Sequence, residues 1–486
     1  MLSLSLHDSS PVVRTLPQTV VAQLSPSSET QGPASRYVAR WLFLALGSLL
    51  LAGLLSLAVV IGRLPPLSRL IDDPLFFKRC LVVHVDLALV VWFYAFNSAL
   101  AALRVRCHAG WHEGVAFISA VLGVVFLVLG GALTGAAPVL ANYIPVVDHP
   151  VFLLGLGLFF FGVIAHTLRT LGESTFQRAG GLSPDAGVGV QASGLALVLA
   201  ASSWVSAQAG LPEGLDRRTH FEFAHWGAGH VLQVANVAAM LAIWLWLAAR
   251  ATGRPVLTAR RARWLFGCLL LPHAVMPLLS WQGALHRTYV EGATLLMRWG
   301  IFPVVLATLV LCLRHRRQRP DRIATEYTRL LWTGLATSAG LTLLGFLLGA
   351  CIRGSTTLVP AHYHASLGGI TAAFMVAAHL LKDQLSPASS SALQSGGGHA
   401  RSARQQLICF GAGQAVFALG FGWAGLHGLG RKVYAGEQHV RTFSEHVGLG
   451  IMGLGGLVAA AGGVWFLVLL LRRHPSLSPQ PSPVSS

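Results

Sequence analysis

Histidines inside apolar segments are the side chains of this sequence best suited to chemistry. Residues 361–366 read AHYHAS, which places His362 and His364 two residues apart at the start of a long apolar stretch. Neutral imidazole binds iron, copper and zinc, and it is the usual axial ligand of heme iron. On a helix of about 100° per residue, two such side chains point about 200° apart. The pair is therefore suited to two metals on opposite faces of one helix, and not to one metal.

The elements that must carry these histidines are membrane helices. Of the 486 residues, 54% are hydrophobic and 11% are charged, whereas a soluble domain carries about 25% charged residues. A spanning helix needs about 20 mainly apolar residues. Twelve stretches meet this length, so we predict an all-α membrane protein, a bundle of twelve transmembrane helices, over residues 37–62, 80–103, 113–136, 150–172, 188–210, 219–249, 263–281, 290–313, 328–352, 359–381, 405–427 and 446–471.

The predicted bundle forms one domain, residues 36–473, between two polar tails. Residues 1–35 and 474–486 are rich in Ser and Pro, and we predict that both are disordered. Lysine and arginine are concentrated in the loops on the side of the two termini, which places both termini in the cytoplasm. We therefore expect an integral membrane protein, located in a bacterial inner membrane.

Six histidines share a similar depth on this topology. His84, His225, His230, His273, His362 and His364 come from four predicted helices, and a rise of 1.5 Å per residue puts them roughly 5–16 Å from the outer face. A histidine within a span indicates a functional site, although any single one is as well explained as a hydrogen-bonded packing residue. Six at matched depth are harder to explain by packing alone.

Several other kinds of site are not indicated. The six cysteines are scattered without a CxxC or CxxCH motif, so there is no sign of a disulfide framework, a zinc finger or a covalently attached c-type heme. The net charge of +17 is explained by arginines beside the membrane, and no nucleic-acid partner is expected. The inner halves of the spans hold few acids, so no proton-pumping path is evident.

The placement of the histidines resembles the catalytic subunit of the heme-copper oxidase superfamily, in particular the C-family (cbb-type) oxidases and the nitric oxide reductases. The resemblance implies twelve helices with cytoplasmic termini. It places histidine ligands on helices II, VI, VII and X, which here are residues 80–103, 219–249, 263–281 and 359–381. It implies two hemes, with His362 as proximal ligand of the high-spin heme and His84 with His364 around the low-spin heme. His230, in a Gly-His pair on helix VI, corresponds to a ligand of the second metal, copper or iron.

Other positions match the family only in part. Arg431 and Lys432 resemble the basic pair that holds the heme propionates; the alternative is an ordinary solvated charge pair. Helix VII of the family carries His-His, but this chain has His273 followed by Ala274, so one ligand of the second metal is missing. His225 or His286 would have to complete the set; otherwise the second metal is labile or absent.

The resemblance implies a membrane oxidoreductase in which electrons pass from the low-spin heme to the high-spin heme, where O2 or NO is reduced. His362 and His230 would be the catalytic residues, and the electron donor would be a cytochrome or a c-type cytochrome subunit on the outer face. Two alternatives stay open: a non-catalytic diheme protein (a sensor, electron carrier or assembly factor) that lost the second metal, and a transporter with functional histidines. The roles of further polar residues near the outer face are not assigned: Asp86, Glu222, Tyr289, Glu291 and Arg298.

Overall fold

The computed structural model describes residues 33–61, 73, 75–105, 110–173, 181–318, 325–385, 397–431, 440 and 442–472. The predicted tails lie almost wholly outside these ranges, so their predicted disorder is not tested. Lys432 and residues 386–396 also lie outside the described residues.

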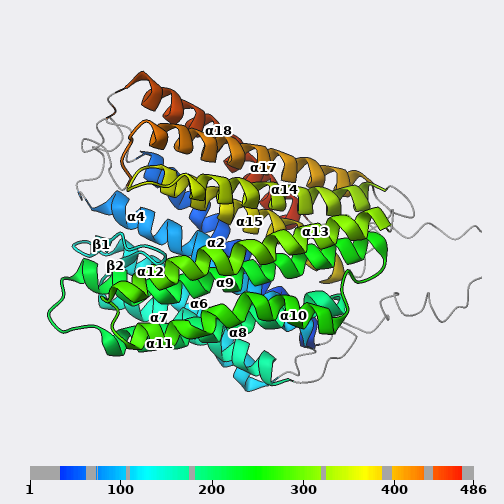
Figure 1. Cartoon of the computed structure of the whole chain (residues 1–486), viewed down its shortest axis with the longest axis horizontal. Coiled ribbons are helices and arrows are strands. Elements are labelled where there is room, and N and C mark those ends of the chain that lie inside the picture. The colour runs from blue at the N-terminus through cyan, green and yellow to red at the C-terminus, as the bar shows by residue number, and fades with distance from the viewer. Residues whose placement is uncertain are drawn as a thin grey trace, which may run out of the picture.

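Twelve helical spans are long and apolar enough to cross a membrane within the described part of the chain, as predicted. Eight are single helices: α2 (Pro33–Ile61), α6 (Trp111–Ala132), α7 (Pro150–Gly172), α8 (Pro184–Gly210), α9 (Arg217–Thr252), α14 (Glu326–Ala350), α15 (Leu358–Leu385) and α18 (Phe443–Leu471). A ninth, α17 (Gly397–Leu426), begins eight residues earlier than the predicted 405. The helices run side by side along the long axis of the molecule (Figure 1).

The other three spans are each interrupted by a short segment of different winding. They are α4 (Phe76–Val85), η1 (Asp86–Val91) and α5 (Trp92–Arg104); α10 (Ala259–Leu270), η2 (Leu271–Val275) and α11 (Met276–Trp281); and α12 (Arg287–Leu296), η3 (Met297–Ile301) and α13 (Phe302–Gln318). The segments η1 and η3 are π-helical and η2 is a 3-10 helix. Such irregular turns inside helices frequently mark functional sites. Here they adjoin or contain His84 and His273.

One small hairpin departs from the all-α expectation. The predicted third helix reached residue 136, but α6 ends at Ala132 and the chain then forms β1 (Ala137–Val139) and β2 (Val146–Asp148). The two strands are antiparallel, with Ala137 opposite Asp148 and Val139 opposite Val146. The hairpin lies at the same end of the bundle as the start of α4 (Figure 1).

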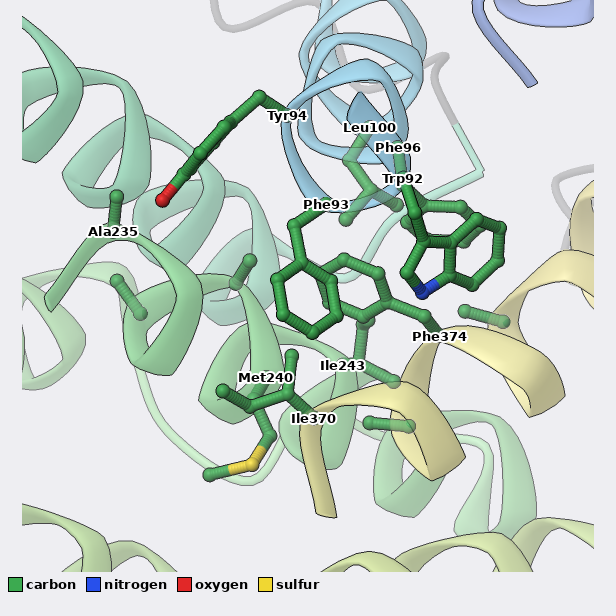
Figure 2. Packing of buried hydrophobic residues seen from close by; sticks show 14 of the residues in the cluster. Trp92, Phe93, Tyr94, Phe96, Leu100, Ala235, Met240, Ile243, Ile370 and Phe374 are labelled. Carbon is green, nitrogen blue, oxygen red and sulfur yellow. The ribbon is translucent and has the colours of Figure 1, made fainter. Parts of the chain in front are cut away.

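The centre of the bundle is formed by α9, α15 and the α4–η1–α5 span. The most apolar windows of these spans are 94%, 78% and 72% buried inside the protein, more than those of any other span. An aromatic cluster joins them, with Phe96 of α5 stacked on Phe374 of α15 at 4.5 Å between ring centroids. Figure 2 shows Trp92, Phe93 and Phe374 packed beside Met240 and Ile243 of α9. Five of the six histidines singled out above therefore sit on the most enclosed helices.

Close helix pairs depend on glycine at their crossing points, as is common where helices pack without bulky side chains between them. In the α6–α7 pair, a Cβ added to Gly123 would lie 2.4 Å from the backbone nitrogen of Phe159 and 2.7 Å from the carbonyl oxygen of Gly155. These are backbone atoms, so they cannot move aside without separating the helices.

We expect Gly123→Ala to destabilise the protein, because overpacking of this kind typically costs about 1–3 kcal/mol. The measurement is the temperature of heat-induced aggregation in detergent at a fixed heating rate. Gly114→Ala in the same helix is the matched control, since nothing lies within 4 Å of its added Cβ. Equal thermal stability of the two variants would contradict the close α6–α7 contact.

Candidate functional site

His84 and His364 come together between α4 and α15. The two imidazoles are near enough to interact electrostatically. His84 donates its Nδ1 proton to the carbonyl oxygen of Ala52 in α2, at 2.7 Å. His364 lies against two aromatic rings of α17, with ring centroids 4.7 Å from Phe417 and 5.9 Å from Phe421. The two histidines assigned above to one heme thus lie within electrostatic range of each other.

His362 leaves the same helix toward a different neighbour. Its Nδ1 donates to the carbonyl oxygen of Gly345 in α14, at 2.7 Å. The ring also packs over Gly349, where an added Cβ would lie 2.7 Å from His362 Nδ1. His362 therefore contacts α14 while His364 contacts α17, in agreement with the separation of about 200° expected for positions two residues apart.

His230 of α9 and His273 of η2 form a second pair of interacting imidazoles. His230 Nδ1 donates to the carbonyl oxygen of Trp226 at 2.7 Å, and His273 Nδ1 donates to that of Leu269 at 2.8 Å. The His273 ring rests on η3, because a Cβ added to Gly300 would lie 2.6 Å from its Cε1 atom. The irregular turns η2 and η3 thus position this side chain.

One feature is shared by His84, His230, His273 and His362. In each, Nδ1 faces a backbone carbonyl, which can only accept a hydrogen bond. Nδ1 therefore carries the proton, and the Nε2 lone pair is left for another partner. Metal-ligating histidines are typically oriented in this way by a hydrogen bond from their second nitrogen. The donor chemistry of His84, His364 and His362 fits axial ligation of heme.

The donors for a second metal do not fit in the same way. His230 Nε2 already has a partner, the hydroxyl of Tyr143 at 2.8 Å. His225 contacts the backbone of Ile144, and its buried Nδ1 has no hydrogen-bond partner within the described part of the chain. His286 is exposed at the N-cap of α12 and bonds Thr288. Among the described residues, no group of three or more His, Cys, Asp or Glu side chains is arranged to hold a metal ion.

Tyr143 was not singled out in the sequence, and no local motif marks it. It lies between β1 and β2, and it is the only residue other than glycine with positive φ in the described ranges, at 66°. Such a backbone costs about 1–3 kcal/mol and persists where surrounding contacts impose it. Burial raises the pKa of its hydroxyl, and the nearby charge of Glu222 raises it further. The phenol is therefore protonated at neutral pH and can donate to His230.

Two contacts tie this hairpin to the start of α9. Glu222 accepts hydrogen bonds from the backbone nitrogen of Asn142 at 2.9 Å and from its side-chain amide. Asp148 pairs with the Arg217 guanidinium, whose hydrogen bond holds the pKa of that carboxyl below its usual range. Glu222, whose role the sequence left unassigned, thus bonds Asn142 and holds the hairpin against α9.

The other unassigned polar residues have distinct settings. The carboxyl oxygens of Asp86 are fully buried in η1 without a hydrogen-bond partner in the described chain. The hydroxyl of the fully buried Tyr289 accepts from the backbone nitrogen of Gly227 at 2.6 Å and donates to the carbonyl oxygen of Phe223 at 3.0 Å. Glu291 is exposed and pairs with Arg287 at 2.8 Å.

Arg431 is held beside the start of α15. Its backbone nitrogen and its Nε donate to the carbonyl and hydroxyl oxygens of Ser355, at 3.3 and 3.0 Å. The preceding Gly430 bridges to Thr356. Arg431 thus lies at the same end of α15 as His362 and His364.

The opposite end of the bundle holds an acidic group that sequence reasoning missed. Glu113 of α6 is fully buried, 2.7 Å from His166 Nδ1 and 3.1 Å from Arg169 Nε. His166 Nε2 donates to the carbonyl oxygen of Ser98 at 3.0 Å. A pocket of about 420 Å³ adjoins Glu113, His166 and Arg169. Position 113 reads as an ordinary residue of a helix first turn, and only the packing of α5, α6 and α7 buries it.

No family model matches the chain. An uncharacterized protein of Aquifex aeolicus is 31% identical over 338 residues, which cover 68% of this chain and 80% of the relative. An uncharacterized protein of Rickettsia prowazekii is 24% identical over 88% of this chain and 94% of its own length.

Among solved structures, a cryo-EM structure of a heme-copper terminal oxidase dimer covers 91% of this chain and 84% of its own chain, with a TM-score of 0.62 and 13% identity. The likeness confirms the predicted fold of twelve membrane-spanning helices. The chain therefore belongs to the family of the Aquifex aeolicus protein, and its fold is similar to that of the solved heme-copper terminal oxidase.

Proposed function

We propose that this chain is a membrane oxidoreductase that holds two hemes, one between His84 and His364 and one on His362, and reduces O2 or NO. The observation that carries the proposal is the arrangement on α15: His364 pairs with His84, while His362 leaves the same helix toward α14. Heme bound at these positions would accept electrons and, where iron keeps an open position, bind a diatomic ligand. The oxidase-like fold supports this reading.

The side chains around these ligands would orient them and limit access of water. The Ala52 and Gly345 carbonyls hold His84 and His362 with Nε2 available. Phe417 and Phe421 cover the His364 ring. Arg431 lies at the same end of α15, where a guanidinium suits a heme carboxylate. Lys432 would be the second cation of that pair.

We further propose that the histidine end of the bundle faces the outer side of a bacterial inner membrane, with both termini in the cytoplasm. An electron-donor cytochrome or c-type cytochrome subunit would dock on that side. O2 is the preferred substrate over NO, because the described residues at the histidine end include no dense set of glutamates of the kind that NO reduction at an iron site favours. Glu222 is bonded to Asn142 and Glu291 to Arg287, so neither is free to join such a set.

One observation favours a second candidate function, that of a non-catalytic diheme protein. Of the histidines considered for the second metal, His230 and His225 contact the 140–145 loop and His286 is exposed. Catalytic and non-catalytic proteins differ in turnover, so consumption of O2 or NO by purified protein under a chemical reductant discriminates them. A protein with both heme spectra and no turnover would support the second candidate.

We expect His84→Ala and His364→Ala each to abolish the low-spin absorption bands in a reduced-minus-oxidised spectrum, because each removes one of two axial ligands. CO binding at the other heme is expected to remain. His379→Ala is the matched control, since it removes another buried histidine of α15 about 26 Å along the helix from His362. Unchanged low-spin bands in either variant would refute the pairing.

We expect His362→Gly to lose CO binding and turnover together, since the proximal ligand would be gone. Added imidazole is expected to restore part of the CO spectrum by filling the space left by the side chain. Gly349 supplies the room for that ring. If His362→Gly keeps native CO binding without imidazole, His362 is not the proximal ligand.

A further inference from the structure

Both ring nitrogens of His230 are already engaged within the protein. Nδ1 donates to the Trp226 carbonyl at 2.7 Å, so the only lone pair of the neutral ring is on Nε2. That lone pair accepts the Tyr143 hydroxyl at 2.8 Å. A metal would need the same lone pair. The phenol and a metal are therefore competitors for one atom of His230.

The Tyr143 ring packs against α9 at Gly229, where a larger residue would collide with it. A Cβ added to Gly229 would lie 2.4 Å from both Cβ and Cγ of Tyr143, so only glycine at this position admits the ring. The ring also contacts His230 at 4.6 Å and the edge of Trp226 at 5.9 Å between centroids. Trp226, Gly229 and His230, within one and a half turns of α9, thus form the surface against which the Tyr143 ring packs.

The loop that carries Tyr143 is bonded to the same helix through residues on both sides of Tyr143. Asn142 bonds Glu222, Ile144 contacts His225, and Asp148 pairs with Arg217. These contacts impose the positive φ of 66° on Tyr143, a conformation that a tyrosine rarely adopts alone. The contacts of the whole hairpin with α9 therefore hold the Tyr143 hydroxyl beside His230.

Too few other nitrogen ligands are available for a metal to displace the Tyr143 hydroxyl from His230. His273 offers one buried Nε2 without a hydrogen-bond partner in the described residues. His225 also has an unpartnered Nδ1 among these residues, but it lies five residues before His230, and such positions point about 140° apart on a helix. The next position is Ala274, which has no donor. A single imidazole binds first-row metals weakly, and copper(II) requires further nitrogen or oxygen ligands.

We propose that the second site of this chain is a metal-free tyrosine–histidine pair, in which the Tyr143 hydroxyl occupies the coordination position on His230 and holds a proton there. The idea of a second site rests on the proposed function. The hydrogen bond between Tyr143 and His230, and the packing of the Tyr143 ring on Gly229, do not depend on that function. Tyr143 is a positioning residue for His230 in this proposal.

The test is Cu(I) binding to the purified full-length protein, measured by competition with a chromophoric chelator, together with metal counts per chain. We expect no stoichiometric non-heme metal in the wild type. Tyr143→Phe keeps the ring and removes the competing hydroxyl, so we expect it to bind Cu(I) about tenfold more tightly. That ratio corresponds to about 1.4 kcal/mol, the scale of one displaced hydrogen bond. The gain is expected to vanish in Tyr143→Phe/His230→Ala.

Tyr289→Phe is the matched control. Tyr289 is also buried against a glycine of α9, Gly227, but its hydroxyl bonds the backbone of Gly227 and Phe223 and no histidine among the described residues. We expect this variant to bind Cu(I) as the wild type does.

Two results would overturn the proposal. One is a copper or non-heme iron atom per wild-type chain that is lost in His230→Ala. The other is equal, His230-dependent Cu(I) affinity in wild type and Tyr143→Phe. Heme spectra recorded on the same samples report the proposed function separately, because none of these substitutions changes His84, His362 or His364.

Discussion

An imidazole buried among apolar helices must keep its N–H group bonded, since an unpaired buried donor costs about 1–3 kcal/mol. This constraint organises the whole site. His84, His230, His273 and His362 each meet it by donating from Nδ1 to a backbone carbonyl. The tautomer and the direction of each ring follow, and Nε2 keeps the lone pair, which in His230 accepts the Tyr143 hydroxyl.

The constraint is met in two ways with different consequences. His230 and His273 donate to carbonyls four residues earlier in their own spans, so their orientation is local. His84 and His362 donate to α2 and α14, so their orientation depends on how the helices pack. The two histidines assigned to different hemes are thus both sensitive to the arrangement of the bundle.

The second requirement is space for large rings, and glycine residues that face the rings provide it. Gly349 faces His362, Gly300 faces His273, and Gly229 faces Tyr143. The turns η2 and η3 contribute by altering the winding of the spans around His273 and Gly300. Rings, glycines and irregular turns therefore act together at one end of the molecule, while the Glu113–His166 pair occupies the other.

The sequence by itself determined the twelve spans, because a spanning helix must be long and apolar whatever its neighbours are. It also determined that His362 and His364 serve different partners, because helical spacing alone separates them. Only the tertiary structure decided which nitrogen of each histidine is available and what lies against it. The β1–β2 loop carries Tyr143 to a residue 87 positions away, and burial of Glu113 requires three helices to meet. Such contacts join positions far apart in the chain, so no local pattern of apolar and polar residues encodes them.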